Sequence, residues 1–291
     1  MHVPRFWEHE STELTAKTGD VMRPTCWGWS ETSVAEAKQR ASETLGRLVS
    51  HFSGHDEMPD HYGYGVRLPR EQIIDEIHDS AGETKAMVTR NVAGSLILNT
   101  RNLIFIDVDL PSLSLRRPAA VGFFGKLFGQ TPAVDPEVTA REHLSGLIDQ
   151  AAGNFPQIGF RIYETRNGYR IMVGNRAEPA DSALVRDLFQ RFGADPLYVR
   201  LCESQKCFRA RLSPKAWRCQ LRPPPHRFPF SGQAQEAANE IWQAMYLDAC
   251  QKRSTCRFVK SFGPDECIDQ IADLVELHDS LTKSFSDEPL A

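Results

Sequence analysis

Apolar residues recur at helical spacing in several separated stretches of the chain, and these stretches predict its helices. The first helix is expected to begin at Ser33, where Ser33 and Glu36 form a capping-box pattern. A short helix is expected from Pro69 through Ile77, because proline favours the first helical position. The other predicted helices cover residues 136–151, 184–192, 234–249 and 265–283.

Runs of β-branched and aromatic residues predict strands between these helices. Residues 102–109 (NLIFIDVD) are apolar on both faces, which is typical of a strand covered on both sides. Residues 158–175 predict two strands around the turn Arg166-Asn167-Gly168, since Asn-Gly favours a hairpin. Further strands are expected within residues 85–100, 195–202 and 206–212.

The strands gather in the middle of the chain, which predicts an α/β (α+β) protein with a mixed β-sheet core. We expect this core at residues 86–218, after a helical and irregular arm at 1–85 and before a helical region at 219–291. Residues 111–134 carry Pro, Gly and Phe, and we expect them to form an insertion that can dock a protein partner. One compact unit is favoured over independent domains.

The bulk composition is that of a globular protein, with 41% hydrophobic and 25% charged residues in 291. No apolar run approaches the ~18 residues of a membrane helix, and the N-terminus lacks a signal-peptide pattern, so we expect a cytoplasmic protein with no membrane contact. Seven cysteines without a CxxC pair argue against a disulfide framework. A zinc site from Cys202, Cys207 and Cys219 with His226, or from the last three cysteines, remains an alternative to buried thiols.

Charge is unevenly distributed along the chain, although its net value is only −4. Residues 200–227 contain eight Lys or Arg and one acid, Glu203. A basic segment of this kind attracts phosphate, although a solvated basic surface would have the same composition.

Two aspartates at the end of a buried strand provide the clearest candidate chemistry. Asp107 and Asp109 are two residues apart, so both side chains point to the same face of the strand. Paired carboxylates there favour a hard divalent cation such as Mg²⁺ or Mn²⁺. Metal-dependent nucleotidyl or phosphoryl transferases, sugar-nucleotide glycosyltransferases and haloacid-dehalogenase-type phosphatases use such a pair. The phosphatases are disfavoured because a third of the chain precedes the pair and Pro111 stands where they carry Thr or Val.

The order of motifs after this pair is more specific. The hairpin turn carries Arg166, the returning strand carries Arg170, and Asp195 precedes a closing R-x-R-x-x-P-K segment. Over about residues 86–218, this order resembles the archaeo-eukaryotic primase superfamily of primase-polymerases. The sequence departs from that family in having Arg170 where a histidine is expected, and in lacking a glycine in the closing segment.

The resemblance implies an RRM-like primase-type topology and a metal-dependent nucleotidyltransferase. Such an enzyme would be a DNA-binding protein that uses a single-stranded or primed nucleic-acid template. Its other substrates would be nucleoside triphosphates. It implies that Asp107, Asp109 and Asp195 are catalytic and hold Mg²⁺ or Mn²⁺, with Glu203 as an alternative third acid. The implied nucleotide- and phosphate-binding residues are Arg166, Arg170 and Lys215, and the implied nucleic-acid-binding residues are Arg209, Arg211 and Arg218. Tyr198, Phe208 and Trp217 are candidates for base stacking or for core packing.

Two other functions remain open at this stage. The change from histidine to Arg170 also fits a non-catalytic nucleic-acid-binding protein of the same fold, since a guanidinium holds phosphate but does not shuttle protons. A GT-A-type glycosyltransferase would use the same acid pair, but it needs an N-terminal nucleotide-binding βαβ unit that the first 60 residues do not predict.

Overall fold

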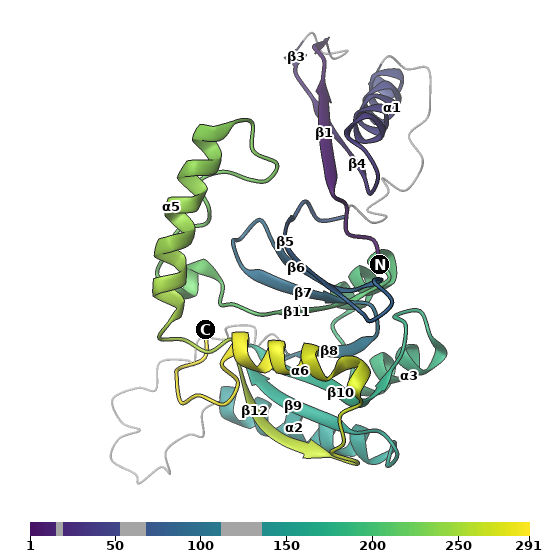
Figure 1. Cartoon of the computed structure of the whole chain (residues 1–291), viewed down its shortest axis with the longest axis vertical. Coiled ribbons are helices and arrows are strands. Elements are labelled where there is room, and N and C mark those ends of the chain that lie inside the picture. Colours follow the sequence, from purple (N-terminus) through teal and green to yellow (C-terminus); the bar gives the residue numbers. More distant parts are fainter. Residues whose placement is uncertain (16–19, 53–67, 112–135) are drawn as a thin grey trace, which may run out of the picture.

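A computed structural model describes residues 1–15, 20–52, 68–111 and 136–291. The described chain is mixed α/β, with two four-stranded sheets, two two-stranded sheets and six α-helices. Figure 1 shows an N-terminal hairpin with its helix, then one four-stranded sheet, then the other sheet with its covering helices, in order along the long axis. The predicted α/β class is confirmed at this level. The 111–134 insertion falls almost entirely outside the described residues.

The N-terminal part is more regular than the sequence predicted. β1 (Phe6–Ser11) pairs antiparallel with β4 (Thr25–Ser30), and the short strands β2 (Leu14–Thr15) and β3 (Val21–Met22) pair with each other. The predicted helix is present as α1 (Val34–Phe52), and the amide of Glu36 donates to the Ser33 hydroxyl, as a cap requires. Gly28 lets β4 and α1 touch, because a Cβ there would lie 2.0 Å from the carbonyl oxygen of Ala37.

The four-stranded sheet next to the N-terminal hairpin has the order β11-β7-β6-β5. Its strands are β5 (Gln72–His78), β6 (Thr84–Arg90), β7 (Leu96–Thr100) and β11 (Phe208–Arg211). The helix expected from Pro69 to Ile77 is therefore wrong. β5 pairs with β6 through two register shifts, and these bulges break the strict alternation, leaving apolar residues at a spacing that imitates a helix.

The other four-stranded sheet, which carries the candidate site, has the order β12-β9-β10-β8 with antiparallel pairing throughout. Its strands are β8 (Leu103–Asp109), β9 (Phe160–Thr165), β10 (Gly168–Ala177) and β12 (Cys256–Phe262). The hairpin predicted around Arg166-Asn167-Gly168 is confirmed as β9 and β10. β12 was not predicted, so the region after 219 is less purely helical than expected.

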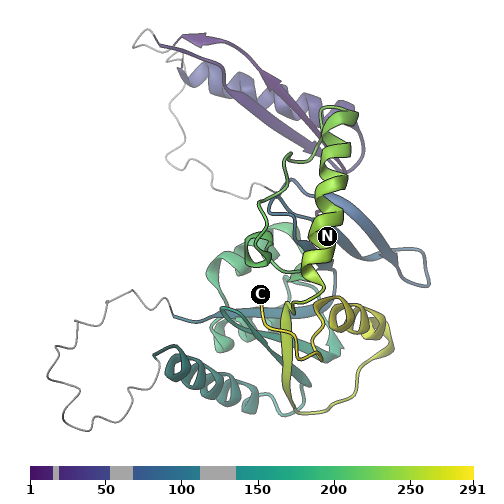
Figure 2. The same cartoon turned by 90° about the vertical axis from the view of Figure 1, so that its left-hand side faces the viewer.

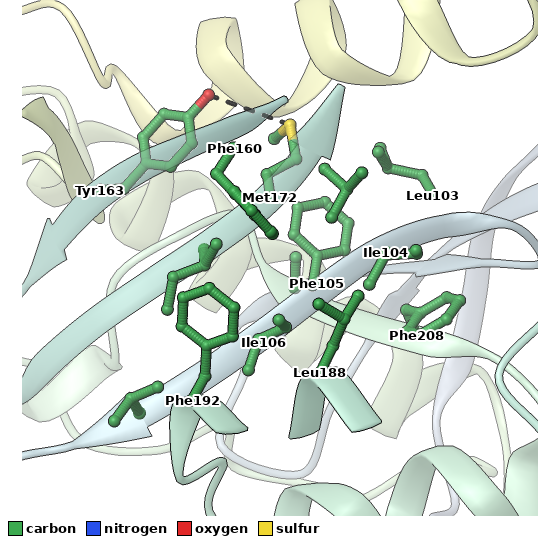
Figure 3. Close-up of a cluster of buried hydrophobic side chains, with 14 of the residues drawn as sticks. Leu103, Ile104, Phe105, Ile106, Phe160, Tyr163, Met172, Leu188, Phe192 and Phe208 are labelled. Atoms are coloured by element: carbon green, nitrogen blue, oxygen red, sulfur yellow. Dashed lines mark hydrogen bonds between the residues drawn. The ribbon is translucent and has the colours of Figure 1, made fainter. Parts of the chain in front are cut away.

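Helices cover both faces of this sheet. α2 (Pro136–Gly153) and α3 (Ala183–Phe192) lie on one face and α6 (Asp269–Thr282) on the other. In Figure 3, Leu188 and Phe192 lie below the sheet, while Tyr163 and Met172 point towards α6. β8 is consequently buried on both sides, with Leu103 to Ile106 each fully inaccessible, as the sequence predicted.

The chain changes sheet between β7 and β8, which are separated by two residues but pair with different partners. The facing edges of the two sheets, β8 and β11, contact each other. Between β8 and β11 in the sequence lies α4 (Pro196–Gln205), where a strand was predicted. That prediction is wrong because Asp195 caps the helix and Pro196 occupies its first position, a combination that starts helices.

The chain ends with a 3₁₀ turn, η2 (Ala216–Cys219), the long helix α5 (Gln233–Cys250), β12 and α6. Figure 2 shows α5 running upright beside the two sheets towards the N-terminal hairpin. Within the described residues no helix combines the length and apolar character needed to cross a membrane.

Candidate functional site

Backbone packing at the end of β8 fixes the two aspartates. Asp107 lies opposite Arg170 and Asp109 opposite Gly168 in the β8–β10 pairing. A Cβ at position 168 would lie 2.1 Å from the carbonyl oxygen of Val108, so only glycine lets the hairpin approach β8 this closely. Both aspartates line one cavity of about 240 Å³, consistent with their shared face of the strand.

Asp195 lies at the same cavity although it is 86 residues beyond Asp109. Its backbone N–H donates to the carbonyl oxygen of Asp107 at 3.0 Å. Its carboxylate caps α4 by accepting from the amides of Leu197 and Tyr198, at 3.2 Å each. The Tyr198 hydroxyl adds a second tie to β8 by donating to the carbonyl oxygen of Phe105 at 2.8 Å. The structure therefore brings the three predicted acids to one cavity.

The three carboxylates are close enough to influence one another electrostatically. The pKa of Asp109 is raised by burial and then by the charges of Asp195 and Asp107, and the opposing influence of Lys215 and Arg211 is smaller. The Asp109 carboxylate makes no hydrogen bond to the described residues. A cation bound between these carboxylates would reverse the shift.

Arg170 is buried beside Asp107 and holds it in place. Its Nε donates to Asp107 Oδ1 at 2.9 Å, and its Nη1 donates to the carbonyl oxygen of Arg211 at 2.9 Å. Burial is the largest single influence and acts to lower the pKa of Arg170, but the charge and hydrogen bond of Asp107, together with Cys256 and Tyr198, raise the pKa overall. Arg170 therefore stays charged and is committed to Asp107 and to the edge of the other sheet.

Three basic side chains, Arg211, Lys215 and Arg218, line the same cavity. Burial lowers the pKa of all three, and repulsion among these cations and the nearby Arg170 and Arg166 lowers it further. Arg218 donates to the Asn167 side chain at 2.9 Å, while Arg211 and Lys215 make no side-chain hydrogen bond or ion pair with the described residues. Among the described residues no acid lies within ion-pair distance of these partly buried cations, and a polyphosphate would supply that contact.

The remaining predicted residues lie elsewhere. Arg209 forms a buried ion pair with Glu71 at 2.7 Å on the other sheet and does not line the cavity. Glu203 is exposed on α4 and also lies outside it. Arg166 pairs with Glu137 at 3.0 Å and lines an adjoining, larger cavity.

This adjoining cavity measures about 700 Å³ and shares Asp109, Asn167 and Arg218 with the first. Trp217 lies at its wall with 63% of its surface exposed, and the Arg218 guanidinium stacks 4.9 Å from the Trp217 ring centre. Tyr198 and Phe208 are buried in the core, so of the three aromatic candidates Trp217 alone is placed to stack on a base.

One residue at the site, His278 on α6, was not identified from the sequence. Its Nε2 lies 3.4 Å from Nη1 of Arg170, and its Nδ1 lies 2.9 Å from Asp279 Oδ1. Burial lowers the pKa of His278 to about 4, so the ring is neutral at pH 7. It follows Arg170 by 108 residues, and no local motif could have linked the two.

The acidic side chains fit a hard divalent cation in kind, since Asp107, Asp109 and Asp195 bring carboxylates to a common cavity. Within the described ranges, however, no three Asp, Glu, His or Cys side chains are gathered closely enough to form a ready metal site. Asp107 is held by Arg170 and Asp195 by the α4 amides, which accounts for the open arrangement. In the described part of the chain the cysteines gather no zinc site either, and all seven are free thiols.

Comparison with known proteins adds no relative: no protein-family model, curated protein or solved structure matches the chain.

Proposed function

We propose that this protein is a metal-dependent nucleotidyltransferase of primase-polymerase type, acting on nucleic acid with nucleoside triphosphates. The observation that carries the proposal is a cavity lined both by three carboxylates and by the basic side chains of Arg211, Lys215 and Arg218. A nucleoside triphosphate with its cation would neutralise both sets of charges at once. We also propose that the fold has the RRM-like, primase-type topology that the sequence resemblance implies.

The chemistry follows from acids and bases that line one cavity. A 3′-hydroxyl loses its proton to solvent and attacks the α-phosphate, a new O–P bond forms, the bond to the β-phosphate breaks and pyrophosphate leaves. Lys215 and Arg211 hold the leaving phosphates, and Arg170 keeps Asp107 oriented. Mg²⁺ or Mn²⁺ held by Asp107, Asp109 and Asp195 would supply charge neutralisation at the α-phosphate and a more acidic hydroxyl.

The test is incorporation of labelled dNTP and NTP on single-stranded and primed templates with Mg²⁺ or Mn²⁺. The Asp107→Asn/Asp109→Asn variant keeps the side-chain shape and removes two charges, and we expect it to lose at least about 10²-fold in rate. Asp181→Asn/Asp187→Asn is a matched control, because both residues lie outside the cavity. Incorporation that persists in the first variant, or is absent from the wild type, would contradict the proposal.

A second function, nucleic-acid binding without catalysis, is favoured by the Arg170–Asp107 ion pair, which occupies one of the implied metal ligands. The two are separated by metal dependence: a pure binder keeps its affinity for nucleic acid in EDTA and shows no incorporation. The glycosyltransferase alternative is disfavoured, because a βαβ unit needs parallel neighbouring strands and the described strands of both four-stranded sheets pair antiparallel.

A further inference from the structure

A second group of arginines forms a small basic cleft that shares no residue with the candidate site. Arg70 precedes β5, Arg90 ends β6, and His226 and Arg227 lie in the segment leading to α5. Among the described residues no Asp or Glu lines the cleft, and its remaining lining residues are neutral. The described part of the fold therefore gathers cations here without an acid beside them.

Neutral groups hold these arginines in place. The Arg70 guanidinium stacks 3.9 Å from the ring centre of Trp27. Arg90 donates to the carbonyl oxygen of Gly94 at 2.9 Å, while its buried Nε has no hydrogen-bond partner. The side chains of Arg70 and Arg227 make no hydrogen bond or ion pair with the described residues, and Arg227 is exposed.

The pKa values of the arginines in this cleft are shifted in the same direction as those of the basic residues at the candidate site. Burial lowers the pKa of Arg90, and burial together with the charge of Arg227 lowers the pKa of Arg70. Among the described Lys and Arg residues, a lowered pKa is otherwise found only at the candidate site, in Arg211, Lys215 and Arg218. In both places a bound anion would raise these lowered pKa values by stabilising the charged form of the side chains.

The size of the cleft limits what the anion is. Its volume is about 20 Å³, room for one water-sized group. A nucleotide does not fit inside it, but the oxygens of a phosphate presented from outside do. Phe228 and Phe230 line the same cleft and offer apolar surface beside that phosphate. These dimensions favour the backbone of a polymer over a free nucleotide.

The two basic places are joined by one short segment of chain. Lys215 and Arg227 are 12 residues apart, so at most about 40 Å of backbone separates them. A nucleic-acid strand with one phosphate per ~3.4 Å covers that span with about 12 nucleotides.

We propose that the cleft of Arg70, Arg90 and Arg227 binds backbone phosphates of the nucleic-acid strand that enters the candidate site. The second half of this statement rests on the proposed function, whereas phosphate binding by the cleft does not.

The test is the salt dependence of binding to fluorescent dT20 in EDTA, for the wild type, Arg227→Gln and Arg70→Gln/Arg227→Gln. Each lost phosphate contact should make the slope of log K against log salt shallower by about 0.7, which is about fivefold in affinity at 0.1 M salt. Arg191→Gln is the matched control, since it removes one charge from an exposed residue of α3. Arg227 is exposed, so its variant reports on the cleft even where the double variant folds poorly.

Unchanged slope and affinity in Arg227→Gln and in the double variant, or an equal effect of Arg191→Gln, would overturn the inference, as would a wild type that binds no dT20. Binding of ATP is measured in parallel, and we expect it to be unaffected by the cleft variants. A fall in ATP affinity with dT20 binding unchanged would assign the cleft to a free nucleotide and overturn it too. Because these measurements need no metal and no turnover, failure of incorporation would sink the proposed enzyme and leave this result standing.

Discussion

Replacing His278 by glutamine should remove a large part of the acid sensitivity of this protein. The ring is fully buried, and it lies against Arg170, Asp279 and Cys256. Asp279 accepts and Arg170 donates, so the neutral ring carries its proton on Nδ1 and offers Nε2 to the guanidinium. Glutamine has an oxygen that can take the place of Nε2 without a titrating group.

The size of the effect follows from the pKa of His278, which burial, chiefly, lowers from 6.5 to about 4. Between these values the unfolded chain binds a proton that the folded protein excludes, so stability rises with pH across this window. The stabilisation is complete above pH 6.5 and is lost as the pH falls towards 4. With 1.36 kcal/mol per pKa unit, the free energy of unfolding should fall by about 2 kcal/mol from this group between pH 7 and pH 5.

Urea unfolding at pH 7, 6 and 5 measures this loss in the wild type and in His278→Gln. We expect the variant to lose about 2 kcal/mol less than the wild type over that range, and a variant of the exposed His143 to behave like the wild type. Equal losses in the wild type and His278→Gln would refute the reasoning. An NMR titration of the wild type tests it without any variant, and a His278 pKa above 6 would be equally decisive against it.

Three further variants test the packing and the site. Arg209→Met should lower the free energy of unfolding by about 3–5 kcal/mol, because it leaves Glu71 buried and unpaired, and adding Glu71→Leu should restore most of the loss; a change below about 1 kcal/mol in urea unfolding would make the pair a surface-like one. Trp217→Ala should leave stability within about 0.5 kcal/mol but weaken dT20 binding by about 1–3 kcal/mol, and unchanged polarisation would exclude stacking. Gly28→Ala should destabilise α1 by about 1–3 kcal/mol, because the new Cβ meets Ala37, and unaltered hydrogen exchange in α1 would contradict this.

Local signals in the sequence were enough for the centre of the fold. The apolar run before Asp107 and the Asn-Gly turn correctly predicted β8 and the β9–β10 hairpin, because burial on both faces and a tight turn leave their mark on adjacent residues. The elements that were missed depend on distant partners or compete with a stronger local pattern. β12 pairs with β9 from about 100 residues away. In 195–202, β-branched and aromatic residues imitated a strand and outweighed the Asp-Pro start of α4.

The candidate site divides in the same way. Asp107, Asp109, Asp195, Arg170, Arg211, Lys215 and Arg218 were all named from the order of motifs, and the structure gathers them at one cavity. Arg209 alternates with Arg211 along β11, so the two side chains point to opposite faces, and Arg209 is consumed by Glu71. The sequence of a basic segment shows how many cations it contains. Which of them remain unpaired depends on whether a buried acid, such as Glu71, lies beside them in the fold.

Acids and bases of the cavity come from different sheets, since Asp107 and Asp109 lie at the end of β8 while Arg211 ends β11. Arg170 links the two edges by its hydrogen bond to the Arg211 carbonyl. A ligand carrying both signs would act as a clasp across this seam, drawing together two halves that each repel themselves internally. Because such a ligand would contact both sheet edges, we expect its binding to stabilise the contact between the sheets and to raise the free energy of unfolding.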